Sequence, residues 1–345
     1  MEKGPDIRII GNASEEVKNM EKKKIAENLF DHFPSLAERE QKALKKFEYP
    51  KSLEEVALID FANQETNRLM QEVGGVEPYD IPTDNFHLLP PEIYQKACDD
   101  ESNASAFITN QGVLFNAAEL RGNSIHFGST AFHEMLHLKG HTSFEVKHEQ
   151  GKDEANTTLY RSGINIYSLQ ALEKQDLQHA HFKGLTEAII STQESRSLHR
   201  MLELPIFAEE KRRLETEEAM KLKQEIAKEK NINEKDLIWV GTNSSEYEMI
   251  VYINQRRVLD YVIGEIVEEF PHDYSSSEEI FNLFLKAHFT GQILDIARLI
   301  EETFGKDSFR LLGNMSDIES SAALCLESLK KSRARMKKVK TDIPL

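Results

Sequence analysis

The sequence predicts a mostly helical α+β fold with a small β-sheet and a helical C-terminal subdomain. Three observations support this prediction. A capped, amphipathic helical pattern runs from Ser52 to Gly74, two short strand-like segments flank the turn at residues 110–112, and helical patterns dominate the chain from residue 208 onward. The expected architecture is therefore a set of helices around a few short strands.

Composition limits the class of protein. The chain has 345 residues, a net charge of −16 and 39% hydrophobic residues, which suits a globular protein with a substantial core. The acidic balance argues against nucleic acid as a partner, and no apolar stretch is long enough to span a membrane. Cys98 and Cys325 lie far apart without metal-ligand spacing, and the N-terminus does not lead into an apolar signal core. We therefore expect reduced thiols and a cytoplasmic location.

The first half of the chain contains the expected sheet. Residues 1–50 are charged and helix-prone, and Pro34 and Pro50 are expected to break these helices. Residues 106–109 and 113–115 then predict two strands around an Asn/Gly-containing turn, and residues 124–127 predict a third strand. An edge strand here would be able to hold an extended peptide by main-chain hydrogen bonds, whereas an ordinary hairpin is the alternative.

The second half predicts helices. Residues 208–230 are rich in Glu, Lys and Arg and predict one solvated helix, and Trp239 is expected to be a packing anchor. Three apolar helical stripes follow, at residues 258–267, 280–285 and 293–304. His272 and His288 are interpreted as structural. The run from Lys330 to Lys340 holds seven basic residues and predicts a disordered tail.

The strongest chemical signal is the stretch from His133 to His137, which has the form HExxH. Ser129 or Thr130 is expected to cap its helix, and Gly140 to end it. The two histidines are then one turn apart on one face, where both can bind one zinc ion, with Glu134 beside them as a general base. The apolar neighbours predict burial, which is costly for this cluster without a metal. A chance occurrence of the motif is the alternative.

A third zinc ligand has several candidates. Ser143 occupies the position at which a metzincin has its third histidine, which excludes that class. His141 continues the spacing but follows the expected helix end, and His148 lies in a polar stretch. Glu187 is the preferred candidate, because it falls in the expected first turn of an apolar helix that starts near Gly184, where a carboxylate is stabilised by a cation.

The HExxH stretch together with residues 184–190 resembles the thermolysin-like gluzincin metallopeptidases. The resemblance implies a zincin-like fold, one Zn²⁺ per chain on His133, His137 and Glu187, and Glu134 as the base. The sequence departs from the family at Thr186, where an Asn is usual, and at Ser191, where a carboxylate orients a ligand histidine. The 50-residue gap between His137 and Glu187 is long, and its strand-like residues 159–167 are expected to form a hairpin over the cleft. A looser similarity to uncharacterised bacterial HExxH proteins adds no substrate.

In gluzincins a Tyr or His from beyond the second ligand helix stabilises the oxyanion, and Tyr252 is the candidate here. Tyr247, Tyr160 and Tyr167 are the alternatives. The predicted activity is zinc-dependent hydrolysis of peptide bonds in a peptide or protein substrate. A non-catalytic binding or regulatory protein with a structural zinc, closed by His141 or His148, is a second hypothesis, and a helical scaffold without metal is a third.

The pattern also suggests how the chain is divided. The expected parts are a charged helical segment (1–50), a catalytic domain with both ligand helices (51–205), a charged helical spacer (206–235), a helical C-terminal subdomain (236–328) and a basic tail (329–345).

Overall fold

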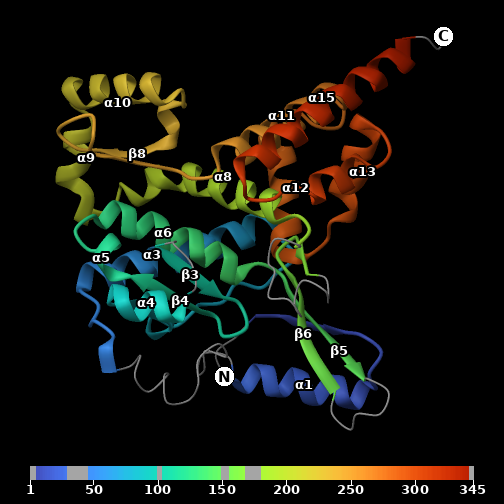
Figure 1. Ribbon diagram of the computed structural model, residues 1–345, viewed down its shortest axis with the longest axis horizontal. Helices are drawn as coiled ribbons and strands as arrows, with labels where there is room; N and C mark the ends of the chain where they lie inside the picture. The colour runs from blue at the N-terminus through green and yellow to red at the C-terminus, as the bar shows by residue number, and fades with distance from the viewer. Residues whose placement is uncertain (1–4, 29–45, 99–102, 149–154, 168–179, 342–345) are drawn as a thin grey trace.

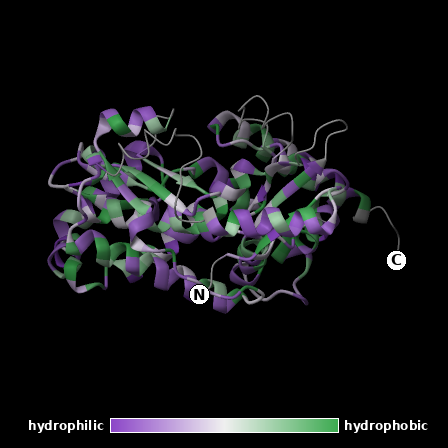
Figure 2. Ribbon diagram, turned by 90° about the horizontal axis from the view of Figure 1, so that it is seen from below, coloured by the Kyte–Doolittle hydropathy of each residue, from purple (hydrophilic) through white to green (hydrophobic). Residues whose placement is uncertain are grey.

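The computed structural model describes residues 5–28, 46–98, 103–148, 155–167 and 180–341. These residues form a mostly helical structure with three small sheets, which confirms the predicted mostly helical α+β class (Figure 1). Most helices mix hydrophilic and hydrophobic residues along their length, as expected for helices that bury one face (Figure 2). Among the described residues, none of the helices combines the length and the apolar character that crossing a membrane would require.

Helix α3 (Leu53–Val73) confirms the expected capped helix. The Ser52 hydroxyl accepts a hydrogen bond from the Glu55 amide at 3.1 Å, and the Glu55 carboxylate accepts one from the Ser52 amide at 2.7 Å. The helix ends at Gly74, as the pattern predicted. Its buried face packs along α6 (Ser124–Lys139), the helix that contains the HExxH motif. Helix α3 thus forms the support behind the motif.

The start of α6 differs from the prediction. Residues 124–127 are the first turn of α6 rather than a strand, and Asn123 caps them by accepting a hydrogen bond from the His126 amide at 3.1 Å. Ser129 and Thr130, expected at the cap, therefore lie inside the helix, whereas Gly140 is its C-cap as predicted. The helical form is favoured because this turn buries Ile125 and Phe127 in the main apolar cluster, where the Phe127 ring lies 5.2 Å from that of Phe115 on β4 (Gly112–Asn116).

The predicted hairpin around residues 110–112 is confirmed. Strand β4 (Gly112–Asn116) lies between parallel β2 (Phe86–Leu89) and antiparallel β3 (Ala104–Phe107), so within the described part of the chain β3 is at an edge of this sheet. The Gln111 side chain in the turn donates to the Leu138 carbonyl at 3.0 Å. The turn is thereby fixed to the end of α6, and β3 lies along the same helix.

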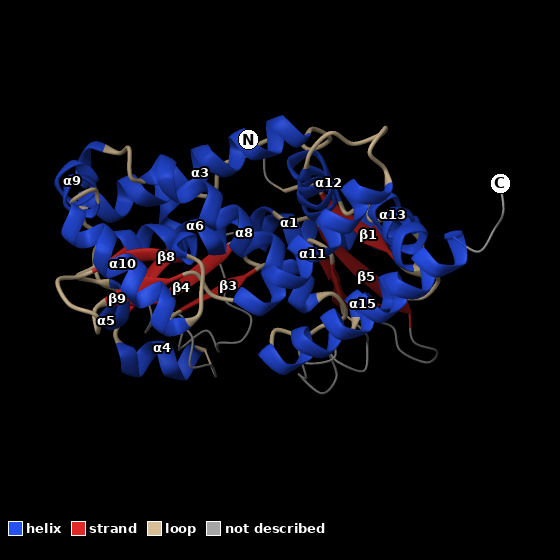
Figure 3. Ribbon diagram, turned by 90° about the horizontal axis from the view of Figure 1, so that it is seen from above, coloured by secondary structure: helices blue, strands red, loops and turns tan. Residues whose placement is uncertain are grey.

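The second sheet has the order β1-β5-β6-β7 and lies apart from the first (Figure 3). Strands β6 (Ala155–Ser162) and β7 (Asn165–Ile166) confirm the predicted hairpin, with Gly163 at φ 58° in its turn. Strand β1 (Ile7–Ile10) was expected to be part of a helical segment, so that prediction was wrong, and strand β5 (Thr142–His148), whose end reaches the polar stretch around His148, was not predicted. These two strands are parallel partners 135 residues apart, and such pairing leaves no local signal.

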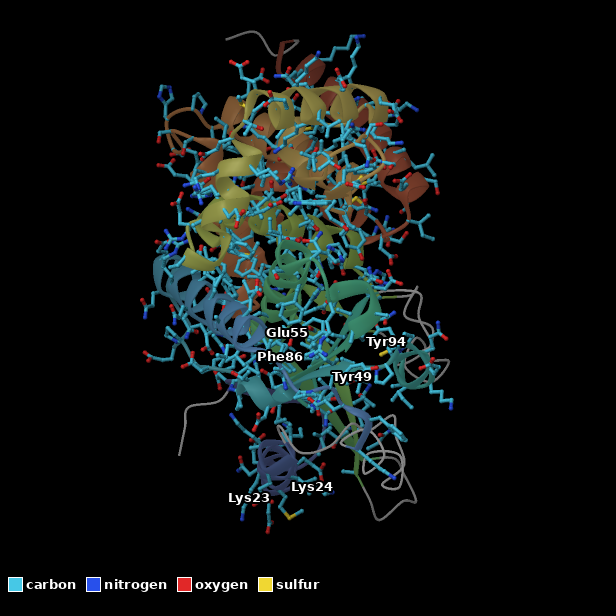
Figure 4. All side chains as sticks on the ribbon, turned by 90° about the vertical axis from the view of Figure 1, so that its left-hand side faces the viewer. Lys23, Lys24, Tyr49, Glu55, Phe86 and Tyr94 are labelled. Atoms are coloured by element: carbon cyan, nitrogen blue, oxygen red, sulfur yellow. The ribbon has the colours of Figure 1, made fainter. Side chains whose placement is uncertain are left out.

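The N-terminal helix α1 (Glu15–Asn28) packs beside β1 and is mostly exposed, with Lys23 and Lys24 at the outer edge of the molecule (Figure 4). Pro34 lies outside the described residues. Helix α4 (Pro91–Ala97) packs on β4, and the short α5 (Ala117–Leu120) leads into α6.

The rest of the chain begins with α8 (Lys183–Met201), which packs on α6. The charged stretch expected as one helix is two, α9 (Ala208–Leu214) and α10 (Glu217–Lys230), because Thr216 caps the start of the second. Strands β8 (Leu237–Val240) and β9 (Tyr247–Met249) form a hairpin that packs on α10. The small apolar cluster between them therefore crosses residue 235, where a boundary was expected.

Five helices complete the fold: α11 (Ile253–Glu269), α12 (Ser277–Thr290), α13 (Leu294–Phe304), α14 (Ser308–Gly313) and α15 (Glu319–Thr341). The basic run that predicted a disordered tail is the last part of α15, so that prediction was wrong. One large apolar cluster extends from Leu58 on α3 to Leu329 on α15. The motif helix and the C-terminal helices thus share one core.

Candidate metal centre

Helices α6 and α8 bring three metal-ligating side chains together. His133 and His137 lie one turn apart on α6, and Glu187 faces them from α8. Glu187 Oε2 lies 3.5 Å from His133 Nε2 and 3.3 Å from His137 Nε2. Lys183 begins α8, so Glu187 is just past the first turn in which it was expected. The structure therefore assembles the two motif histidines and the preferred third ligand at one point.

These atoms fit a metal ion. Glu187 Oε2 is buried and has no hydrogen-bond partner, and the three ligand atoms all lie within 4.8 Å of one another. Ligands held about 2.1 Å from a tetrahedral zinc ion lie roughly 3.4 Å apart, close to both carboxylate–imidazole distances. His133, His137 and Glu187 can thus hold a metal ion. Within the described ranges this is the one such group of three or more residues, and His141 is not part of it.

Glu194 completes the surroundings of His133. Its Oε2 lies 3.0 Å from His133 Nδ1, and its Oε1 accepts a hydrogen bond from Ser129 Oγ at 2.6 Å. Because Nδ1 is engaged by the carboxylate, Nε2 is left to face Glu187 and a metal. Sequence reasoning missed Glu194 and left the orienting carboxylate in doubt at Ser191. The sequence feature that could have identified Glu194 is its spacing: it follows Glu187 by two helical turns and therefore lies on the same face of α8.

The charges of these side chains stabilise one another. Burial opposes the charge on His133, but the nearby carboxylates of Glu187 and Glu194 outweigh burial and raise the pKa of His133 well above its usual range. Burial likewise opposes the charge on Glu187, yet the two imidazoles, His137 above all, hold the pKa of Glu187 well below its usual range. Burial raises the pKa of Glu134, whereas both histidines act in the opposite direction. Burial and pairing thus favour a cationic His133 beside an anionic Glu187, and a bound metal cation would take over the positive charge that this carboxylate requires.

The cluster opens into a cavity of about 550 Å³ that also contains Glu134 and residues of β3. Tyr252 lies in its wall, with its ring stacked at 6.3 Å and 24° on the His133 ring. Of the alternative tyrosines, Tyr167 also lines the cavity, whereas Tyr160 and Tyr247 do not. The structure therefore leaves two tyrosines close enough to act on a bound molecule.

The two ends of the cavity differ in chemistry. Glu194, towards the end of α8, contacts Ser129 and His133, whereas Glu187, near the start of α8, contacts His133 and His137. Because Ser129 precedes His137 on α6, the two helices run antiparallel. Beyond the Glu187 end lies the ion pair of Lys183 with Asp317, at 2.8 Å. The wall near the start of α6 is apolar and comes from the β8–β9 segment: Ile238, Met249 and Val251.

Comparisons with protein-family models, with curated proteins and with solved structures found no match for this chain. A function for the chain therefore has to be inferred from the geometry of this centre.

Proposed function

We propose that the chain is a zinc-dependent metallopeptidase of the gluzincin type. The observation that carries this proposal is the convergence of His133 Nε2, His137 Nε2 and the orphaned Oε2 of Glu187 on one point inside a cavity. Two imidazoles and one carboxylate are the donor set of many catalytic zinc sites. When bound, zinc supplies a Lewis acid that polarises water and the substrate carbonyl.

Glu134 is the proposed general base. It lines the cavity next to His133, and it is half-buried rather than sealed in the core. Its carboxylate would take a proton from the attacking water and pass it to the amine as the peptide C–N bond breaks. The water thereby supplies the hydroxyl of the new carboxyl group and the hydrogen of the new amine.

The arrangement of β3 supports a peptide as the substrate. Among the described strands, this strand is at the edge of its sheet, and its residues Ser105 and Ala106 line the cavity. One side of an edge strand has no neighbouring strand, so an extended peptide can add there as a further strand. The scissile bond of such a peptide would lie across the metal-ligating side chains.

A structural zinc site is less well supported than a catalytic one. A structural site is closed by a fourth protein ligand. In the described part of the chain, His141 does not join the three ligand residues, and the side chain of His148 lies outside it. Three protein ligands beside a cavity leave room for water and substrate. Cys98 and Cys325 are buried and form no disulfide with each other, which supports a cytoplasmic location as part of this proposal.

Zinc content and peptide hydrolysis test the proposal together. We expect about one zinc per wild-type chain, and a marked loss of zinc in Glu187→Ala. Glu134→Gln should keep its zinc but lose hydrolysis of a quenched fluorescent peptide library by about 10²–10⁴-fold, because the amide cannot accept the proton. Glu225→Gln, an exposed change on α10, is the matched control and should retain both properties.

Two results would overturn the proposal. Full activity of Glu134→Gln would remove the general base. Zinc retained by Glu187→Ala would place the third ligand elsewhere, with His141 and His148 as the next residues to change.

A further inference from the structure

The β6–β7 hairpin is fastened to the ligand helix α8. Thr186 Oγ1 donates a hydrogen bond to Asn165 Oδ1 at 2.7 Å, and both side chains are buried. Thr186 directly precedes the metal-ligating Glu187. Gluzincins usually have Asn at the position of Thr186. Here the Thr186 hydroxyl forms a hydrogen bond with the hairpin and so fixes the hairpin relative to the ligand Glu187.

Asn165 passes this constraint on to Tyr167. With its Oδ1 occupied by Thr186, the Asn165 amide has its NH₂ group left to donate. Asn165 and Tyr167 both line the cavity that contains Glu187, so this NH₂ group lies in the wall that also presents the phenol. Burial and the charge of Glu187 raise the pKa of Tyr167, whereas Asn165 acts in the opposite direction, so the phenol keeps its proton and can donate it to a molecule in the cavity.

We infer that Tyr167 is the hydroxyl that stabilises the oxyanion of the attacked peptide carbonyl, and that Thr186 and Asn165 are its positioning residues. This inference rests on the proposed peptidase function. As water adds to the carbonyl carbon, the carbonyl oxygen gains negative charge, and the Tyr167 O–H donates a hydrogen bond to it. The proton stays on the phenol throughout, and no covalent bond to Tyr167 forms.

Tyr252 has a different role in this scheme. Its ring stacks on that of His133, so it packs against a ligand and limits the rotation of the imidazole. Tyr167 follows strand β7, which Asn165 fastens to the ligand helix α8 through Thr186, and it lines the cavity together with Glu187. The sequence-based candidate Tyr252 thus becomes the control for Tyr167.

The first test compares Tyr167→Phe with Tyr252→Phe, each of which removes one hydroxyl and keeps the ring. Loss of an oxyanion donor should lower the kcat of Tyr167→Phe by about 10²–10³-fold with little change in KM. The same variant should bind a phosphonamidate peptide, which mimics the tetrahedral oxyanion, correspondingly more weakly. Zinc content should stay at the wild-type level, and Tyr252→Phe should show a much smaller loss in both measurements.

The second test addresses positioning. Thr186→Val has nearly the same shape but no hydroxyl, so it should lower both kcat and phosphonamidate affinity, whereas Thr186→Ser should restore them. Asn165→Asp replaces the donating NH₂ by an oxygen that would attract the Tyr167 proton, and it should resemble Tyr167→Phe. A purely structural role for Thr186 would lower thermal stability without this selective loss.

The outcomes separate the two proposals. Suppose that the wild type is active. If Tyr167→Phe then retains its kcat and analogue affinity, or if Tyr252→Phe has the larger loss of the two, the assignment of Tyr167 is overturned and the peptidase function stays intact. A wild-type chain that binds zinc but neither cleaves peptides nor binds the phosphonamidate overturns the peptidase function, and the assignment of Tyr167 with it.

Discussion

At the scale of single residues, Glu194 is the unexpected member of the site. Its two oxygens bind different groups of the same helix, His133 Nδ1 at 3.0 Å and Ser129 Oγ at 2.6 Å. A carboxylate held at both oxygens cannot rotate, so it fixes the orientation of the imidazole. Side chains that orient a metal-ligating histidine contribute to metal affinity although they do not touch the metal.

Glu194→Gln should therefore weaken zinc binding by about 10–100-fold, and Ser129→Ala should weaken it by a smaller factor. Chelator competition at constant pH would measure both affinities. Ser191→Ala is the matched control, because Ser191 is buried on the same helix but donates to the Glu187 carbonyl at 2.7 Å. An equal loss in Ser191→Ala would mean that helix α8 as a whole, rather than Glu194, determines the affinity.

The metal ligands and their orienting group differ in how far sequence predicts them. His133, Glu134 and His137 follow from spacing on one helix, and Glu187 follows from an apolar helix with one buried acid. Glu194 has only its spacing of two helical turns from Glu187 as a signal, and this signal is weak because a glutamate near the middle of a helix is usually solvated. Only the antiparallel packing of α8 on α6 places it beside His133.

At the scale of elements, His288 on α12 shows how three segments meet. His288 Nε2 donates to the Leu136 carbonyl of α6 at 2.9 Å, while Nδ1 is buried without a partner. A Cβ on Gly163 of the hairpin would lie 2.5 Å from this ring, so glycine is required there. The structural role expected for His288 thus consists of joining α12 to the motif helix and to the hairpin.

This contact predicts an acid-sensitive stability. Burial, opposed by the Leu136 carbonyl, lowers the pKa of His288 to about 4, with His137, Glu187 and His141 as the nearest charged groups. The unfolded chain, with a pKa near 6.5, binds this proton first as the pH falls. The neutral, buried His288 therefore makes its full contribution to the free energy of unfolding above pH 6.5. This contribution falls by at most about 3 kcal/mol as the pH is lowered towards 4.

Urea unfolding between pH 4 and 7 would measure this effect. In His288→Gln the amide can still donate to the Leu136 carbonyl but cannot titrate. The slope of the free energy of unfolding against pH should therefore be smaller than in the wild type, by the equivalent of about one bound proton. His272→Gln, which changes an exposed histidine, should keep the wild-type slope. An unchanged slope in His288→Gln would assign the acid sensitivity to other groups, of which His141 is the first.

At the scale of the whole molecule, α15 closes the C-terminal helices. Arg333 is 3% exposed, and its guanidinium donates to Glu265 and Glu269 of α11, each at 2.7 Å, and to the Thr303 carbonyl of α13 at 3.1 Å. One side chain therefore joins three helices of the shared core. This contact explains why a run of basic residues is an ordered helix here.

Arg333→Ala should lower the free energy of unfolding by about 3 kcal/mol, because it removes the buried cation between Glu265 and Glu269 and leaves only the more exposed Lys337 beside Glu265. Denaturant unfolding at neutral pH would measure the change. Arg335→Ala, at an exposed position of the same helix, should change stability by less than about 0.5 kcal/mol. Equal stability of the two variants would show that α15 is held by its apolar face alone.

The sequence by itself determined the features that depend on neighbours along the chain. These are the helical class, the capped α3, the hairpin of β3 and β4, and the pair of histidines one turn apart. Each follows from spacing within about 20 residues, where backbone geometry decides which side chains share a face.

The tertiary structure alone decided the features that depend on distant contacts. Strand β1 forms because β5 offers it an edge, the tail of α15 is ordered because α11 supplies carboxylates, and α6 starts early because its first turn packs on β4. The same holds for Glu194 and for the link from Thr186 through Asn165 to Tyr167. In each case the free energy comes from burial and pairing between segments, and no local pattern encodes which segments will meet.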